Sequence, residues 1–443
     1  MNIFRRQPPI ERHTHSSVNV FSIFNLQLFI IFLLALGLRL LVWNWHELYD
    51  LGGDEREYFN QALTLLRTRT YVELNLMRPP LYTGFLASWI YLFDSLVQRL
   101  RLIQAIISAL TIVPIFLLAR QLFGRRVGLL AALLAALNYT LAAHATELLT
   151  ETLFVFGLAT LLWLLVGLTT DDRRRTTGGR QSIKRSPAGR GAWSSVVDSR
   201  WSALLALLAG LNLGALALIR SVALPLLPLG ALWLLFGRPR TKDQGPRTNA
   251  TDGRAVVKSR RSLIFRPWSA WLCFILGALL LIAPWSARNY ATYGALILID
   301  TTGAENLWLD NNPAGAAPGD PLGREAAKRQ LYALGDDRAA RQRLASANGA
   351  AAILTQPAWF LSKAWGQARQ FFALEYFDDM RERRAIWVPP LEVGLRLALG
   401  DGMWLLLVLG GAVGLWLAPA KDEGRKTKDE GPTTMGIKRS SSA

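Results

Sequence analysis

Two carboxylates follow the end of the first apolar stretch of this sequence, and an arginine lies about twenty residues after them. Asp54 and Glu55 follow the apolar residues 25–45, and Arg78 stands directly before a pair of prolines. Adjacent carboxylates just outside a membrane have no obvious structural need, and a guanidinium group pairs readily with phosphate. Acids and a cation held at a lipid surface therefore indicate chemistry on a phosphate-bearing lipid.

Each of these residues also has a purely structural interpretation. Asp54 and Glu55 open a stretch with helical spacing, residues 54–67, and the helix dipole by itself favours acids in a first turn. The preceding Gly52 and Gly53 permit a tight bend that turns a carboxylate back toward the membrane. Arg78 also suits an ordinary helix start, with its side chain reaching the lipid headgroups. We predict that Asp54 and Glu55 are catalytic and that Arg78 binds a lipid phosphate.

Further ionisable residues lie at the ends of other apolar stretches. Glu147 and Glu151 are four residues apart, so a continuous helix would place them on one face. Like charges at this spacing repel, and solvent, a cation or a shared proton must compensate. Arg220 separates two apolar stretches and is a second phosphate candidate, although an arginine reaching the headgroups would have the same pattern. His144 is more typical of a membrane interface than of a ligand.

The composition predicts that these residues belong to a membrane protein. The chain has 443 residues, is 51% hydrophobic and carries a formal net charge of +18. Several apolar runs approach or reach the roughly 20 residues that cross about 30 Å of hydrocarbon. The runs are residues 25–45, 80–97, 102–120, 127–144, 148–168, 202–219, 221–237, 269–287 and 403–418. The single cysteine, Cys273, excludes an intramolecular disulfide, and the four histidines lack metal-ligand spacing, so we expect no metal site.

The positive charge predicts how many of these runs cross the membrane. It lies mainly in the connections between runs and at the termini, a pattern that orients membrane proteins and does not indicate nucleic acid. If all nine runs crossed, Asp54 and Glu147 would lie on opposite sides and the basic loops would face outward. If run 80–97 lies along the outer interface instead, as its Trp, Tyr and Asp residues indicate, every basic segment becomes cytoplasmic. We therefore predict an all-α integral membrane protein with about eight transmembrane helices, one interfacial helix in the first outer loop, and both termini in the cytoplasm.

The predicted organisation follows from this topology. It comprises a cytoplasmic N-terminus at 1–24, a transmembrane module at 25–287 with disordered cytoplasmic loops at 171–200 and 238–268, a small outer helical segment at 288–402, a last transmembrane helix at 403–418 and a disordered cytoplasmic tail at 419–443. The candidate residues then all lie at the outer face.

Several short motifs occur in a characteristic order between about residues 36 and 373. They are Gly53-Asp54-Glu55 with Tyr58, Arg78-Pro79-Pro80-Leu81-Tyr82, Leu218-Ile219-Arg220, Ala283-Pro284-Trp285-Ser286-Ala287-Arg288-Asn289-Tyr290, and Glu305-Asn306-Leu307-Trp308 followed by Asn311-Asn312-Pro313. In this order and spacing the chain resembles the multi-spanning GT-C glycosyltransferases, in particular the bacterial protein-mannosyltransferase-like and aminoarabinose-transferase-like enzymes of glycosyltransferase family 39 and those that act on lipopolysaccharide core. It departs from many relatives in having only one span after the long outer segment.

The resemblance implies a GT-C-like helix bundle that uses a polyprenyl-phosphate-linked sugar at the outer face. It implies that Asp54 is the base or orienting carboxylate, with Glu55 as its neighbour, and that Arg78 and Arg220 hold the donor phosphate. The Asn-rich stretch would contribute Asn306 and Asn311 to the outer site. With Glu147 and Glu151, these asparagines make up the predicted acceptor or sugar site.

The predicted reaction is an inverting single displacement. A sugar on a polyprenyl phosphate already carries a good leaving group, so a carboxylate that takes the acceptor proton and cations that stabilise the phosphate suffice. The sequence has no Walker loop, GxSxG elbow or GxGxxG motif opening a helix. We expect no cofactor, and leave open whether a divalent cation assists.

The partners and one other functional class remain open. The sugar, a hexose or pentose, is undetermined, and the acceptor is the hydroxyl of a lipid, glycan or protein. Basic asymmetry and the lack of a disulfide indicate a bacterial plasma membrane, whose lipids are further partners. The alternative is a polytopic transporter or lipid-linked sugar flippase, because prolines interrupt several apolar runs. A non-catalytic scaffold would leave the outer acids and arginines unexplained.

Overall fold

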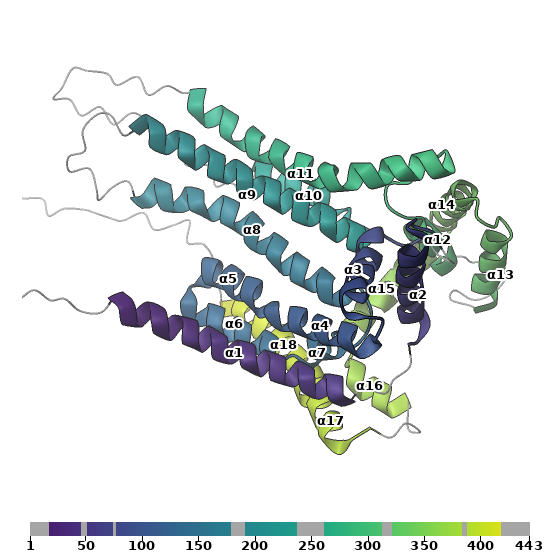
Figure 1. The fold of residues 1–443 in the computed structure, drawn as a ribbon, viewed down its shortest axis with the longest axis horizontal. Coiled ribbons are helices and arrows are strands. Elements are labelled where there is room, and N and C mark those ends of the chain that lie inside the picture. Colours follow the sequence, from purple (N-terminus) through teal and green to yellow (C-terminus); the bar gives the residue numbers. More distant parts are fainter. Residues whose placement is uncertain are drawn as a thin grey trace, which may run out of the picture.

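The computed structural model describes residues 17–45, 51–73, 77–178, 191–236, 261–311, 321–382 and 388–417. These residues are helical apart from turns and short connections, and no β-strand occurs among them. Long helices run side by side, and a group of short helices gathers at one end of the bundle (Figure 1). That end carries α2 (Gly53–Thr68) and α3 (Pro80–Phe93), and we call it the α2–α3 end.

Within the described residues, six helical segments are long and apolar enough to cross a membrane. They are Leu26–Trp45 in α1 (Ser17–Trp45), Val97–Phe123 in α4 (Val97–Leu110) and α5 (Ile112–Phe123), Glu151–Leu168 in α8 (Glu151–Gly178), Trp201–Ile219 in α9 (Gly191–Ile219), Trp268–Tyr293 in α11 (Arg261–Tyr293), and Pro390–Leu417 in α17 (Pro390–Leu395), the π-helical η2 (Arg396–Asp401) and α18 (Gly402–Leu417). Each contains or overlaps one of the predicted spans. The predicted all-α polytopic bundle is confirmed.

The other two predicted spans are not single long helices. Run 127–144 is divided into α6 (Arg125–Leu137) and α7 (Tyr139–His144) at Asn138, whose side chain accepts a hydrogen bond from the Leu141 amide and caps α7. Run 221–237 begins as the 3₁₀ turn η1 (Ser221–Ala223) and continues as α10 (Leu226–Phe236). The prolines at 225 and 228 lack the backbone N–H that a continuous helix would use. The prediction of about eight spans thus becomes six long helices and two shorter apolar segments in the described residues.

The run that starts at the double proline does not have the length of a membrane span. Helix α3 has 14 residues, which extend about 21 Å at 1.5 Å per residue, less than the roughly 30 Å of a hydrocarbon core. It packs against α2, with Tyr58 and Ala62 of α2 and Leu86 of α3 in one buried apolar cluster. This arrangement agrees with the prediction of a non-crossing helix.

The predicted outer segment 288–402 is largely helical. It contains α12 (Thr302–Asp310), α13 (Pro321–Tyr332), α14 (Arg338–Thr355), α15 (Pro357–Phe371) and α16 (Glu375–Glu382), all at the α2–α3 end (Figure 1). A buried ion pair of 2.8 Å between Glu305 and Arg341 joins α12 to α14.

Helices extend into two segments that we predicted to be disordered. Helix α8 continues to Gly178, α9 already starts at Gly191 and α11 at Arg261. Arginine and alanine favour helices, so a helix can continue beyond its apolar part. The rest of the predicted loops, residues 179–190 and 238–260, and the predicted tail lie outside the described residues, as do residues 1–16.

Close packing of α9 on α11 depends on glycines. A Cβ added at Gly210 would lie 2.0 Å from the carbonyl oxygen of Phe274, and one at Gly277 would lie 2.4 Å from that of Leu207. Small residues let apolar helices approach closely in a membrane.

We expect Gly210→Leu to lower the free energy of unfolding by about 1–3 kcal/mol, because the added side chain forces the two helices apart. The thermal unfolding midpoint in detergent, followed by tryptophan fluorescence, measures this loss. Gly410→Leu is the matched control, because a Cβ at Gly410 meets no atom within 4 Å. Equal midpoints for the two variants would contradict the role of Gly210.

Candidate active site

A cavity of about 840 Å³ lies at the α2–α3 end of the bundle. Five residues singled out from the sequence line it together, although they are distant along the chain. They are Asp54, Arg78, Glu151, Arg220 and Asn306. They come from α2, the entrance to α3, the start of α8, the end of α9 and α12. The tertiary fold therefore brings the predicted catalytic carboxylate and both predicted phosphate ligands to one cavity.

Arg78 is held between two carboxylates of α2. Its Nη2 atom donates to Asp54 Oδ1 at 2.7 Å and its Nε atom donates to Glu57 Oε2 at 3.0 Å. The guanidinium carbon lies 4.6 Å from the centre of the Tyr58 ring. The Arg78 side chain is 8% exposed, whereas that of Asp54 is 62% exposed. Arg78 thus orients Asp54, whose carboxylate remains accessible from the cavity.

The charge of Arg78 is stabilised despite its burial. Burial alone lowers the pKa of this guanidinium, but the hydrogen bonds that it donates to Glu57 and Asp54 and the adjacent Tyr58 raise it above its ordinary value. Arg78 therefore remains a cation at every physiological pH. Because its donors already serve two carboxylates, it is less available to a phosphate than the sequence predicted.

Contacts from α11 hold the chain that enters α3. The Tyr71 hydroxyl donates to the backbone carbonyl of Arg78 at 3.1 Å. Arg288 forms an ion pair of 2.6 Å with Glu73 and donates to the Tyr71 carbonyl at 2.8 Å. Arg288, part of the motif at residues 283–290, thus has a structural role near the end of α11: it holds the chain before α3 through Glu73 and Tyr71.

Arg220 is the more accessible cation of the cavity. It follows the last turn of α9 in an extended conformation and forms an ion pair of 2.7 Å with Glu151, the first residue of α8. The Arg220 side chain is 45% exposed and that of Glu151 is 27% exposed. A partly exposed guanidinium with one carboxylate partner can donate to an incoming phosphate.

Three predicted site residues do not line this cavity. Glu55 Oε1 accepts a hydrogen bond from the Leu148 amide at 2.8 Å and lies 3.4 Å from the Arg101 guanidinium, so it joins α2 to the segment before α8. Glu147 contacts His144 at 3.1 Å. Asn311 donates to the Leu307 carbonyl and accepts from Lys363, inside the group of short helices. In this structure all three side chains contact other protein groups outside the cavity.

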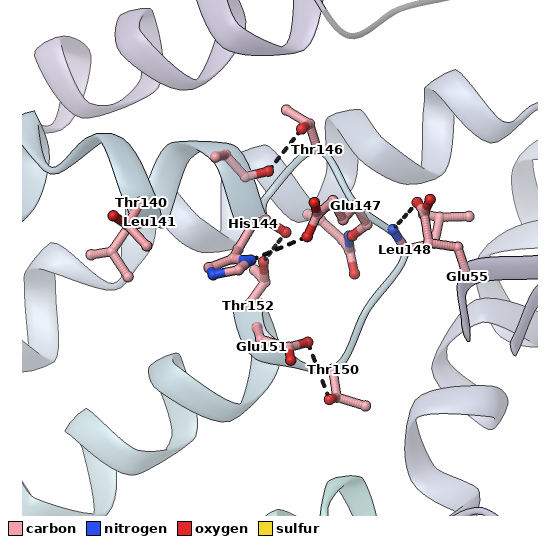
Figure 2. A network of polar contacts seen from close by, with 12 residues as sticks. Glu55, Thr140, Leu141, His144, Thr146, Glu147, Leu148, Thr150, Glu151 and Thr152 are labelled. Carbon is pink, nitrogen blue, oxygen red and sulfur yellow. Dashed lines mark hydrogen bonds and ion pairs between the residues drawn. The ribbon is translucent and has the colours of Figure 1, made fainter. Parts of the chain in front are cut away.

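Glu147 and Glu151 do not share a helix face, contrary to the prediction. Helix α7 ends at His144, α8 begins at Glu151, and the residues between them form turns (Figure 2). Side chains of other elements bind the backbone here, because Gln104 donates to the carbonyl of Glu147 and Glu55 accepts from the Leu148 amide. These bonds replace those of a helical ladder, and the two glutamates acquire different partners.

Three residues of this site were not among those predicted from the sequence. Glu57 lies three residues after Asp54, and this helical spacing could have revealed it as the second partner of Arg78. Asp300 and Gln342 line the cavity from the chain before α12 and from α14. No sequence motif marks either residue.

Asp300 is a third carboxylate of the cavity, after Asp54 and Glu151. Its Oδ1 atom accepts a hydrogen bond from the Thr302 amide at 3.0 Å, and its Oδ2 atom is buried. Burial raises the pKa of Asp300, while backbone hydrogen bonds from residues 302 and 303 act in the opposite direction. Among the described residues, no group of three His, Cys, Asp or Glu side chains is arranged to hold a metal ion.

Comparison with known proteins agrees with the resemblance found in the sequence. The family model of dolichyl-phosphate-mannose-protein mannosyltransferases matches residues 77–177, a segment that contains Arg78 and Glu151. The resemblance to GT-C mannosyltransferases is thereby confirmed over this part of the chain. A comparison with curated proteins gives no match.

Two solved structures of an oligosaccharyltransferase from Archaeoglobus fulgidus are similar to this chain. The apo form is 14% identical with a TM-score of 0.42, and the similarity covers 96% of this chain and 41% of that protein. The complex with zinc and sulfate is 16% identical with a TM-score of 0.30, and the similarity covers 88% of this chain and 50% of that protein. This chain thus spans half the length of that enzyme or less.

Proposed function

We propose that this protein is a membrane glycosyltransferase that moves a sugar from a polyprenyl phosphate to an acceptor hydroxyl. The observation that carries the proposal is the meeting of an exposed carboxylate, Asp54, with two arginines in one cavity beside apolar helices of membrane-spanning length. The family match over residues 77–177 supports the same class of reaction.

The residues of the cavity have different roles in the proposed reaction. Arg220 binds the donor phosphate, because it is the more exposed of the two cations, and Arg78 orients Asp54. The acceptor oxygen forms a bond to the anomeric carbon as the bond from that carbon to the phosphate oxygen breaks. The phosphate takes the electron pair, Asp54 takes the acceptor proton, and the configuration at the anomeric carbon inverts.

The proposal extends to location and cofactors. The cavity faces the outside of a plasma membrane, because the basic connections lie at the opposite ends of the apolar runs and mark the cytoplasmic side. No cofactor is required, because the donor already contains its leaving group. Whether a divalent cation assists at the phosphate is decided by adding EDTA to the assay below.

The test is transfer of radiolabelled sugar from a polyprenyl-phosphate hexose, with the protein in lipid nanodiscs. We expect Arg220→Ala to raise the KM for this donor about 10–100-fold, because a charge-assisted contact to the phosphate is lost. Arg324→Ala is the control, an exposed arginine of α13 that pairs with Asp310. If the label is never transferred but crosses the bilayer of a vesicle, the protein is a transporter and the proposal is wrong.

A further inference from the structure

Helix α15 has an apolar side that no other described part of the protein covers. None of its 15 residues, all within the described part of the chain, is buried. Leu361 and Trp365 are each 66% exposed, and Phe372, the residue that follows the helix, is 59% exposed. None of these three side chains lines the cavity of Asp54. The reaction proposed above therefore gives them no role.

The exposed apolar residues form one stripe along α15. Spacings of three and four residues place side chains on the same side of an α-helix. The residues that follow this spacing are Ala358, Leu361, Trp365, Ala368 and Phe372, and all of them are exposed. Leucine and large aromatic side chains along one side of a helix are typical of helices that lie in the membrane interface.

The opposite side of α15 is attached to α12. Lys363 lies two residues after Leu361, about 200° around the helix. Its Nζ atom donates to Asn311 Oδ1 at 3.1 Å and to the backbone carbonyl of Asp310, the last residue of α12. In Figure 1, α12 and α13 lie farther from the long helices than α15 does. The stripe faces away from α12 and therefore toward the side of the long apolar helices.

The stripe ends at a membrane-spanning helix. Phe371 and Phe372 contact Trp404 of α18, with ring centres 5.4 and 6.2 Å apart. Helix α18 belongs to a segment long and apolar enough to cross a membrane, and its residues Leu405 and Leu406 are exposed. In a bilayer such leucines contact acyl chains. The exposed apolar surface of α15 therefore continues the lipid-facing surface of α18.

Polar residues occupy the border and the far side of the stripe. Arg369 is exposed and lies eight residues after Leu361, about 80° around the helix. From this border its guanidinium can reach a headgroup phosphate. Gln367 is exposed and lies about 200° from Trp365, on the opposite side. This distribution fits the boundary between acyl chains and headgroups.

We propose that α15 lies in the membrane leaflet at the α2–α3 end, with its stripe among the acyl chains next to the headgroups. Lipid is the occupant, because the stripe continues the lipid-facing surface of α18 and faces away from the outer helices. The inference does not depend on the proposed reaction. A membrane-bound α15 holds α12 and α14, which carry Asn306 and Gln342 of the cavity, at the surface of the bilayer.

Single fluorescent labels test the inference, with one copy of the full chain in each nanodisc. The background variant is Cys273→Ala, which removes the only cysteine of the sequence. The fluorophore NBD is attached at Leu361→Cys or Trp365→Cys in the stripe, and at Leu406→Cys as the lipid-exposed reference. Gln367→Cys is the matched control on the opposite side of α15. Equal midpoints of thermal unfolding show that the labelled proteins keep the fold.

Two quenchers distinguish lipid from water around each label. Phosphatidylcholine with a nitroxide near the glycerol end of its acyl chain quenches labels in the bilayer, and iodide quenches labels in water. We expect the nitroxide lipid to quench the two stripe labels as strongly as the label on α18, and about threefold more than the control label on α15. Iodide should quench the labels in the reverse order.

A charge in the stripe provides a second measurement. Leu361→Glu, combined with the label at Trp365→Cys, should reduce quenching by the nitroxide lipid about twofold, because a carboxylate resists transfer from water into the acyl region. Gln367→Glu is the control and should leave this quenching unchanged.

Three results would overturn the inference. Quenching of the stripe labels by iodide and not by the nitroxide lipid would place the stripe in water. Protection from both quenchers would show that another part of this chain covers it, because each nanodisc holds one copy. Equal effects of Leu361→Glu and Gln367→Glu would show that the stripe has no preference for lipid. None of these measurements requires turnover, so they leave the test of the proposed function independent.

Discussion

Asp54→Asn is expected to reduce the rate of sugar transfer about 10²–10⁴-fold, the usual contribution of a positioned base. Asparagine keeps the size of the side chain and can accept the hydrogen bond from Arg78, but it cannot take a proton from the acceptor. Because the Asp54 side chain is 62% exposed, the substitution should leave folding intact. The kcat in nanodiscs measures the loss, and donor binding should change little.

Two further carboxylates make this prediction specific. Asp94→Asn is the control, because Asp94 is exposed at the far end of α3, and we expect full activity. Asp300→Asn tests a carboxylate on another wall of the same cavity. A normal rate for Asp54→Asn together with loss of activity for Asp300→Asn would transfer the role of base to Asp300.

Arg78→Met is expected to have the largest effect on stability, about 3–5 kcal/mol, and to abolish transfer. The side chains of Arg78 and Glu57 are 8% and 14% exposed. Removal of the cation takes the shared ion-pair partner away from Glu57 and Asp54, two like charges at the start of α2. A lower midpoint of thermal unfolding, followed by tryptophan fluorescence, measures this destabilisation.

A second substitution separates the structural role of Arg78 from its functional role. In the double variant Arg78→Met/Glu57→Gln the buried negative charge is removed, so we expect much of the stability to return. Transfer should remain lost, because Asp54 still lacks its orienting partner. Recovery of transfer together with stability would show that Arg78 serves the fold alone.

Much of the fold could be predicted from composition alone. A long uninterrupted apolar run has few alternatives to a membrane-spanning helix, because every backbone polar group must be satisfied within the segment. The distribution of lysine and arginine then indicated that run 80–97 does not cross, and α3 is indeed too short to do so. On that basis Asp54, Glu151 and Arg220 were expected at one face, and they line one cavity.

The breaks in the helices were less predictable. Residues 145–150 carry no proline or glycine, yet they leave the helix because Glu55 and Gln104, which are distant in sequence, bind the backbone there. Such competition between a local helix and long-range side-chain contacts has no local signature. These contacts place Glu147 in the α7–α8 connection and Glu151 in α8, and they keep Glu55 outside the cavity.

By itself, the sequence determined the class of the fold, the end of the bundle that carries the charged residues, and the candidates Asp54 and Arg220. Those inferences depend on apolar length and charge, which are properties of consecutive residues. Only the tertiary structure decided the partners: Arg78 with Glu57, Glu55 with the α7–α8 connection, and Asp300 at the cavity of Asp54 and Arg220. Ion pairs, burial and cavities are set by distances between atoms far apart in the chain, and these distances exist only after folding.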